Sequence, residues 1–205
     1  MDWVTVSKKL ENFWYYYKWY VIGGVFLLLT LLVGIRSCGQ SARMDLYLLY
    51  VRDETPNAAQ TAELEAWIAA LAEDLDQDGA KTAKVLPVAR TNMWNGDDAS
   101  AMVVQVNTGE AVLYILSETA YNTLHTNEVL QDLSAYESPY IEGDCYKLTE
   151  SGVLQSIPGF AEEEATFYLC IRKVDGTAAE GDAHYEAQQK QAKAVLEKII
   201  QKEKK

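Results

Sequence analysis

The chain has little of what usually marks an enzyme or a metal centre. It holds only three cysteines and two histidines among 205 residues, too few for a disulfide scaffold or a zinc site. The sequence contains no nucleophile elbow, phosphate-binding loop, dinucleotide fingerprint or HExxH motif. His125 and His184 lie far apart, without metal-ligand spacing. We therefore expect a non-enzymatic protein with both histidines on its surface.

Basic side chains are also scarce. The chain carries 18 lysines and arginines against 30 acidic residues, a net charge of −12. Residues 44–205 hold thirteen of the basic and twenty-eight of the acidic residues. Nucleic-acid binding requires clustered lysine and arginine to displace counterions, so we expect no nucleic-acid partner. Residues 1–43 have the opposite sign, with five basic and two acidic residues.

The stretch between Lys18 and Arg36 has no charged residue. A helix of this length spans roughly 25 Å, near the short end of membrane-spanning helices. Aromatic residues precede it, and amphipathic rings favour the membrane interface. The pattern predicts a cytoplasmic leader over 1–18, a transmembrane helix over 19–36 and a tether over 37–44. The predicted interface residues are Trp14, Tyr17, Lys18, Trp19, Tyr20 and Arg36.

Two processed forms compete with an uncleaved anchor. A cleaved signal peptide has a short basic start, whereas this leader is long and aromatic. Lipoprotein processing at Cys38 is disfavoured because Arg36 stands where such signals carry a small or apolar residue. Three lysines precede the run and two arginines follow it, which favours a cytoplasmic N-terminus. We expect a single-pass plasma-membrane protein with an extracytoplasmic domain over 45–205.

Hydrophobic patterns in 45–205 alternate between strands and helices. Residues 45–51, 82–90, 111–116 and 165–174 read as strands, and Pro87 suggests that 82–90 lies at a sheet edge. Two stripes of apolar residues, one after the first strand and one near the end of the chain, each predict a helix. A further helix is predicted to begin after Ser117. This order predicts an α/β, three-layer domain with a mostly parallel or mixed sheet. The first stripe comprises Leu64, Trp67, Ile68, Leu71 and Leu75, and the last Tyr185, Ala192, Val195, Leu196 and Ile199.

Several segments leave alternatives open. Residues 99–110 fit a short helix or part of a hairpin, and 127–133 suggest a further helical turn or two. A short strand is expected at 145–148. Cys145 and Cys170 either pair in a disulfide or remain free, with Cys170 as a small buried hydrophobe.

Parts of the domain resemble a known family. The segments DLYLLYV, AELEAWIAALAEDL and AKVLPVA, and then residues 111–136, resemble one lobe of bacterial extracellular solute-binding proteins. That resemblance implies a binding domain for a small ligand or a partner. The chain departs from the family because those proteins close two lobes over a ligand, whereas 45–205 provides about one. The whole layout also resembles small single-pass membrane proteins of clostridia-type Gram-positive bacteria, a group with no established activity.

One acidic turn suggests a cation. Asp74, Asp76, Asp78 and Gly79 match the first half of a calcium loop, D-x-D-x-D-G. Its twelfth position is Val85 instead of the usual glutamate, so a solvated turn with Gly79 at positive φ is the alternative. No other cofactor is expected.

We expect a membrane-anchored extracytoplasmic module that binds a protein or a small ligand. The alternatives are a structural accessory subunit of a membrane complex and a weakly calcium-binding envelope domain.

Overall fold

The computed structural model of the chain describes residues 14–15, 17–20, 22–28, 44–75, 77, 79–89, 106, 109–174 and 179–203. It divides into two units, Met1–Arg43 and Met44–Lys205. In the first unit, the described residues are helical, and many of their aromatic side chains are exposed. Segment 99–110, predicted as helix or hairpin, lies largely outside the described residues.

The predicted transmembrane helix over 19–36 is wrong. No helix among the described residues is both long and apolar enough to cross a membrane. The longest described helix, α6, has lysine, glutamate and glutamine throughout its length.

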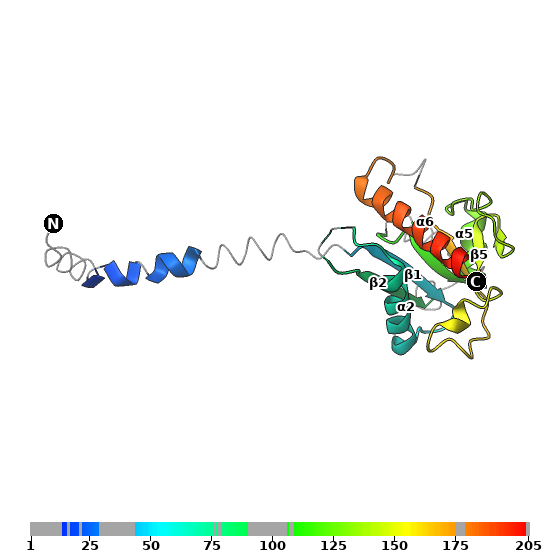
Figure 1. The fold of residues 1–205 in the computed structure, drawn as a ribbon, viewed down its shortest axis with the longest axis horizontal. Helices are drawn as coiled ribbons and strands as arrows, with labels where there is room; N and C mark the ends of the chain where they lie inside the picture. Colours follow the sequence, from blue (N-terminus) through cyan, green and yellow to red (C-terminus); the bar gives the residue numbers. More distant parts are fainter. Residues whose placement is uncertain are drawn as a thin grey trace. The chain divides into compact units, whose positions relative to one another are not determined.

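A mixed six-stranded sheet forms the second unit, with the order β2-β1-β3-β6-β5-β4 (Figure 1). β1 (Leu46–Arg52) pairs in parallel with β2 (Ala83–Ala89) and β3 (Leu113–Ser117). β6 (Phe167–Ile171) runs antiparallel to β3 and to β5 (Cys145–Lys147), and β5 pairs with β4 (Ile141–Glu142). The predicted α/β class and mixed sheet are therefore confirmed.

The sheet separates two cores because successive side chains of a strand point to opposite faces. Leu46, Leu48 and Tyr50 of β1 lie in one core, whereas Leu49 and Val51 lie in the other. The residues of β1 are buried or half-buried along its whole length, as the unbroken apolar pattern predicted. Pro87 lies in β2 at the sheet edge, the position to which proline is usually confined in a sheet.

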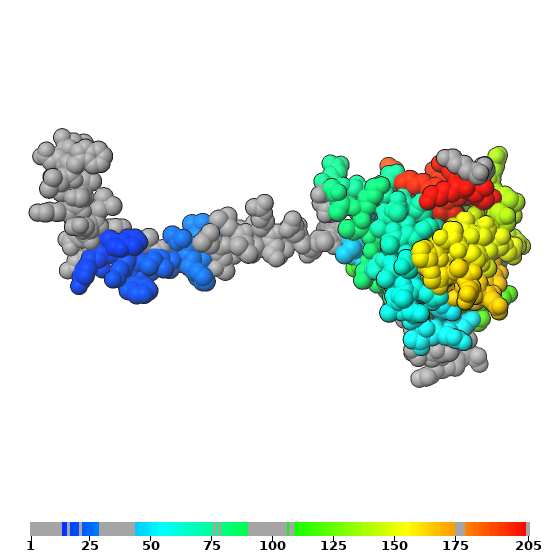
Figure 2. Space-filling view, turned by 60° about the horizontal axis from the view of Figure 1, so that its bottom comes forward, coloured from blue at the N-terminus to red at the C-terminus, as the bar shows by residue number. Residues whose placement is uncertain are grey.

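Two helices pack on the first face of the sheet. α2 (Ala58–Leu71) begins after Asn57, whose side chain accepts a hydrogen bond from the N–H of Ala59 at 2.9 Å. α6 (Ala183–Glu203) buries three glutamines and four residues of its predicted stripe, whereas Tyr185 is half-buried; the four are Ala192, Val195, Leu196 and Ile199. In Figure 2 the yellow segment containing the 3₁₀ turn η1 (Leu154–Ser156) lies beside α2. Gln60 Nε2 of α2 donates to the carbonyl of Gly159 in this segment at 2.9 Å.

α5 (Glu118–Thr126) contributes to the core of the opposite face through Ala120 and Leu124. Ser117 is its N-cap, as predicted, but its hydroxyl donates to Asp53 Oδ1 at 3.3 Å instead of capping the helix. The helical turns predicted for 127–133 are wrong, because Asn127 and Glu128 form a turn after α5 and residues 129–133 contain no helix. Leu130 forms a bridge with Arg172, next to β6. The conformation of this segment depends on its pairing beside β6, and the local sequence pattern does not show that pairing.

Candidate functional site

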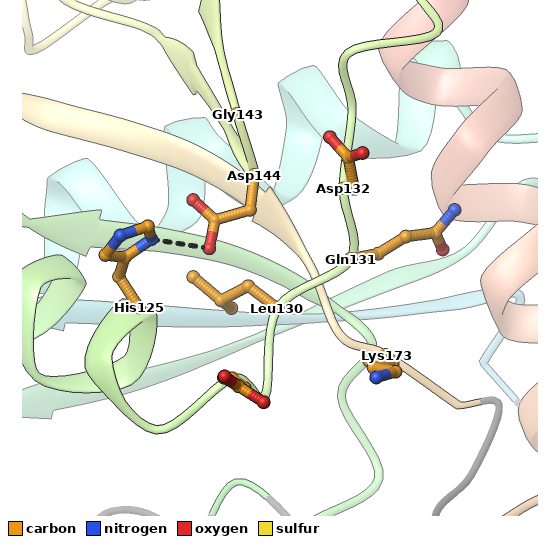
Figure 3. Close-up of a pocket in the computed structure, with 8 residues that line it drawn as sticks. His125, Leu130, Gln131, Asp132, Gly143, Asp144 and Lys173 are labelled. Carbon is orange, nitrogen blue, oxygen red and sulfur yellow. Dashed lines mark hydrogen bonds and ion pairs between the residues drawn. The ribbon is translucent and has the colours of Figure 1, made fainter.

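A hollow of about 430 Å³ opens to solvent on the side of the sheet where α5 ends (Figure 3). Its lining comes from the end of α5, the extended segment after it, the turn between β4 and β5, and the residue after Arg172. Acidic side chains predominate around a buried leucine. The lining residues are His125, Glu128, Leu130, Gln131, Asp132, Gly143, Asp144 and Lys173.

Backbone hydrogen bonds hold these segments together. The N–H of Gln131 donates to the carbonyl of Ile171 at 2.8 Å, and the N–H of Lys173 donates to Val129 at 2.9 Å. On the other side, the N–H of Leu133 donates to the carbonyl of Gly143 at 2.8 Å. Segment 129–133 is thus fixed between β6 and the β4–β5 turn. Gly143 has a φ of 60° in that turn, a conformation that glycine adopts without steric cost.

Asp144 is the centre of a hydrogen-bonded array with Tyr121 and His125. Tyr121 donates its hydroxyl proton to Asp144 Oδ1 at 2.8 Å. His125 Nδ1 lies 2.8 Å from Asp144 Oδ2, the contact drawn as a dashed line in Figure 3. The Asp144 side chain is only 13% exposed, whereas that of His125 is 57% exposed. We call these residues the Tyr121–Asp144–His125 array.

The array fixes which groups act as donors and acceptors. Burial, with hydrogen bonds to Cys145 and Asp144, raises the pKa of Tyr121 well above its usual range, so its hydroxyl stays protonated and donates. The Tyr121 ring stacks on Tyr168 with centroids 4.5 Å apart. Because Asp144 accepts the Nδ1 proton of His125, a neutral imidazole presents Nε2 as an acceptor.

Two further carboxylates line the hollow. Glu128 has a φ of 56°, in the left-handed region that a side chain occupies at a cost. Asp132 accepts hydrogen bonds from the N–H and hydroxyl of Ser134 at 2.9 and 2.8 Å. These bonds lower the pKa of Asp132, so the carboxylate stays ionised at neutral pH. Both side chains are exposed and accessible to a ligand.

The lining offers mainly hydrogen-bond acceptors. Glu128, Asp132 and Asp144 supply carboxylates, and Lys173 is the one cationic side chain if His125 is neutral. No hydroxyl or thiol side chain is among the lining residues. This arrangement suits reversible binding of a donor-rich ligand.

The predicted calcium turn lies elsewhere. Asp74 Oδ2 accepts a hydrogen bond from the N–H of Gly79 at 2.9 Å, and Gly79 has the expected positive φ. Asp76 and Asp78 lie outside the described residues. Among the residues described, no group of three histidine, cysteine or acidic side chains could hold a metal. Calcium binding at this turn stays a prediction.

The predicted interface residues lie in the first unit. The exposed fractions of Trp14, Tyr17, Trp19 and Tyr20 are 54%, 51%, 74% and 78%. Lys18 Nζ lies 6.0 Å from the centroid of the Tyr15 ring. Arg36 is not among the described residues. The role of these side chains at a membrane interface stays a prediction.

Sequence reasoning placed His125 on the surface but missed its partners. Asp144 lies in a two-residue turn, Gly143–Asp144, between short strands. A glycine–aspartate pair between apolar or aromatic segments is a recognisable hairpin signal, so the turn could have been found. The pairing of Asp144 with His125 could not, because it depends on how the hairpin packs beside α5.

No family model, curated protein or solved structure matches this chain. The candidate site therefore rests on its own geometry.

Proposed function

We propose that Met44–Lys205 is a binding module that takes a small organic cation, with a primary ammonium or guanidinium group, in the hollow beside α5. The observation that supports this most is the Tyr121–Asp144–His125 array. It holds both oxygens of Asp144 in place at the rim of the hollow. A carboxylate oriented in this way is ready to accept a charge-assisted hydrogen bond.

The charge of the lining favours a cation over an anion. The three carboxylates outnumber Lys173, and His125 Nε2 is an additional acceptor when the ring is neutral. A ligand rich in N–H donors satisfies these groups, whereas an anion meets repulsion from each carboxylate. The domain as a whole is acidic, so its field also attracts cations.

The dimensions of the hollow favour a small ligand. Its volume of about 430 Å³ falls in the range of small-molecule sites, roughly 300 to 1,000 Å³. Leu130 provides a buried apolar contact for the carbon skeleton of the ligand. The sequence resemblance to one lobe of solute-binding proteins implies the same class of function, and an open hollow on one lobe suits weak, rapidly exchanging binding.

Isothermal titration calorimetry on the full chain tests this proposal. The probes are agmatine and spermidine, with neutral 1-butanol and anionic succinate as controls. The variant is Asp144→Asn, which preserves shape and removes the charge. Glu162→Gln removes one charge from an exposed residue outside the hollow lining and is the matched control. Loss of a charge-assisted hydrogen bond should weaken binding by about 10- to 100-fold in Asp144→Asn.

Glu162→Gln should bind like the native chain. Equal weakening in both variants would attribute the effect to overall charge and refute the site. Binding of succinate as strong as that of agmatine would refute the preference for cations.

A further inference from the structure

We propose that Cys145 and Cys170 are a modification site at which a disulfide forms across β5 and β6. The proposal is independent of the ligand and rests on the register of three neighbouring strands. Cys145 and Cys170 are direct partners in the antiparallel pairing of β5 and β6. Directly opposite residues point to the same face of a sheet, and both side chains lie in the core of the α5 face. Both cysteines are free thiols in this structure.

The pattern of hydrogen bonds shows which type of pair they form. The N–H of Leu148 donates to the carbonyl of Phe167 at 3.0 Å, and the register makes these two residues opposite partners. Hydrogen-bonded and non-hydrogen-bonded pairs alternate along an antiparallel ladder. Cys145 and Cys170 lie three positions along the ladder from Leu148 and Phe167. They are therefore a non-hydrogen-bonded pair.

The next strand gives the same assignment independently. The N–H of Arg172 donates to the carbonyl of Val112 at 2.8 Å, which makes those residues a hydrogen-bonded pair beyond the end of the β3–β6 ladder. Tyr114 and Cys170 lie two positions along the same ladder from Val112 and Arg172. They are therefore also a hydrogen-bonded pair. Because the N–H and C=O of Cys170 face β3, they cannot also face β5.

This geometry suits a disulfide. Partners in a non-hydrogen-bonded pair have Cα atoms about 4.5 Å apart, with their side chains closer than in the other type of pair. Disulfides span Cα separations of about 4.4 to 6.8 Å. The two strands therefore need no large movement to join the sulfur atoms.

The bond forms by thiol–disulfide exchange with a low-molecular-weight disulfide as the oxidant. The thiolate of one cysteine attacks the disulfide, giving a mixed disulfide and releasing one thiolate of the reagent. The second cysteine then attacks the protein sulfur of the mixed disulfide and releases the other reagent thiolate. Two cysteine thiols are oxidised, one reagent disulfide is reduced to two thiols, and the two cysteine protons pass to the released thiolates.

Access to the pair depends on opening of the β4–β5 hairpin. Both side chains are buried, and burial raises the pKa of each thiol, so exchange in the closed structure is slow. β4 and β5 are two and three residues long and lie at one end of the sheet. Short elements at an edge open more readily than a central strand. Oxidation is therefore expected during folding or local opening.

Refolding of the full chain tests the proposal. Cys38→Ser leaves Cys145 and Cys170 as the remaining cysteines, since the chain has three. This variant is refolded from urea with glutathione disulfide or with dithiothreitol, then alkylated, digested and analysed by mass spectrometry. We expect a Cys145–Cys170 linked peptide only after oxidative refolding. The melting temperature of the oxidised protein should exceed that of the reduced protein by about 5 to 10 °C.

The native chain serves as a second test that needs no substitution. Its oxidised form should show the same linked peptide and the same shift, both reversed by dithiothreitol. Alkylation of both Cys145 and Cys170 after oxidative refolding, or a linked peptide without a rise in melting temperature, would overturn the proposal.

Discussion

Two aspartates illustrate how position decides the role of a carboxylate in this domain. Asp45 is 1% exposed, and its oxygens accept from the N–H of Leu75 at 2.6 Å and the N–H of Thr82 at 2.7 Å. It ties the end of the α2 region to the start of β2 and leaves little capacity for a ligand. Asp144 is also held on both oxygens, but it lines the hollow. Asp45 therefore has a structural role, whereas Asp144 is the residue at which the proposed function places the ligand.

Glu128 gives a prediction about strain at the hollow. It follows Asn127, the C-cap of α5, at a φ of 56° where helices commonly have glycine. Glu128→Gly should raise the free energy of unfolding by about 1 kcal/mol, measured by urea denaturation. It should also weaken agmatine binding, because a carboxylate leaves the hollow.

Gln77→Gly is the control for this prediction. Gln77 has a φ of 58° but does not line the hollow, so its variant should gain stability without losing affinity. If Glu128→Gly gains no stability while Gln77→Gly does, the strain assigned to Glu128 is wrong.

Among the elements, α6 combines apolar packing with buried amides. Gln188 is 1% exposed. Its Oε1 accepts from the N–H of Tyr47 at 3.0 Å, and its Nε2 donates to the carbonyl of Asp45 at 2.9 Å. Gln191 Nε2 donates to the carbonyl of Glu73 at 2.7 Å. These bonds fix how α6 lies against β1 and the end of the α2 region, which apolar contacts alone would specify less sharply.

Gln188→Met tests this docking because it retains the shape of the side chain and removes its hydrogen bonds. Buried groups of Tyr47 and Asp45 would lose partners, so the free energy of unfolding should fall by about 2 kcal/mol. The measurement is urea denaturation at neutral pH. Gln201→Met, at an exposed position of the same helix, should change stability little. Equal effects at the two positions would contradict the role of Gln188.

The sequence correctly predicted those elements whose hydrophobic pattern fits only one type of secondary structure. β1 has an unbroken apolar run and β2 a proline that suits an edge, and both lie where expected. The stripe of α2 is also where expected, except that the helix ends at Leu71 and the last predicted member, Leu75, is exposed. Segment 127–133 was wrongly predicted as helical because its leucines and valine suit both a helix and a strand. The bridge between Leu130 and Arg172, which the local pattern does not show, excludes the helix. The buried glutamines of α6 were missed because polarity usually signals exposure. The hollow joins residues distant in sequence, so no local period could reveal it.

At the scale of the whole molecule, buried tyrosines make the domain sensitive to alkali. Tyr50, Tyr114 and Tyr146 are each 0% exposed. Burial raises the pKa of Tyr50 and of Tyr146 to about 12, and it raises that of Tyr114 further. The unfolded chain loses these protons near pH 10. Stability is therefore fully present below about pH 10 and falls as pH rises toward 12.

Each such tyrosine should remove about 1.4 kcal/mol of stability per pH unit in this window. Circular dichroism and tyrosinate absorbance, followed together, should show unfolding and ionisation of these tyrosines in one transition. Tyr50→Phe should make the decline in stability less steep. Full tyrosinate absorbance in a chain that keeps its folded spectrum would contradict this prediction.

The bond between Gln188 and the start of β1 also has a consequence for biosynthesis. The first strand leaves the ribosome long before α6, yet the N–H of Tyr47 receives its partner from a residue 141 positions later. The central strand β1 must also wait for β3, and β3 for β6, before the sheet is complete. Such distant pairings delay folding. The apolar residues of β1 therefore lack their native neighbours until α6 has been synthesised, so the pairing of β1 with the rest of the sheet is a late step in folding.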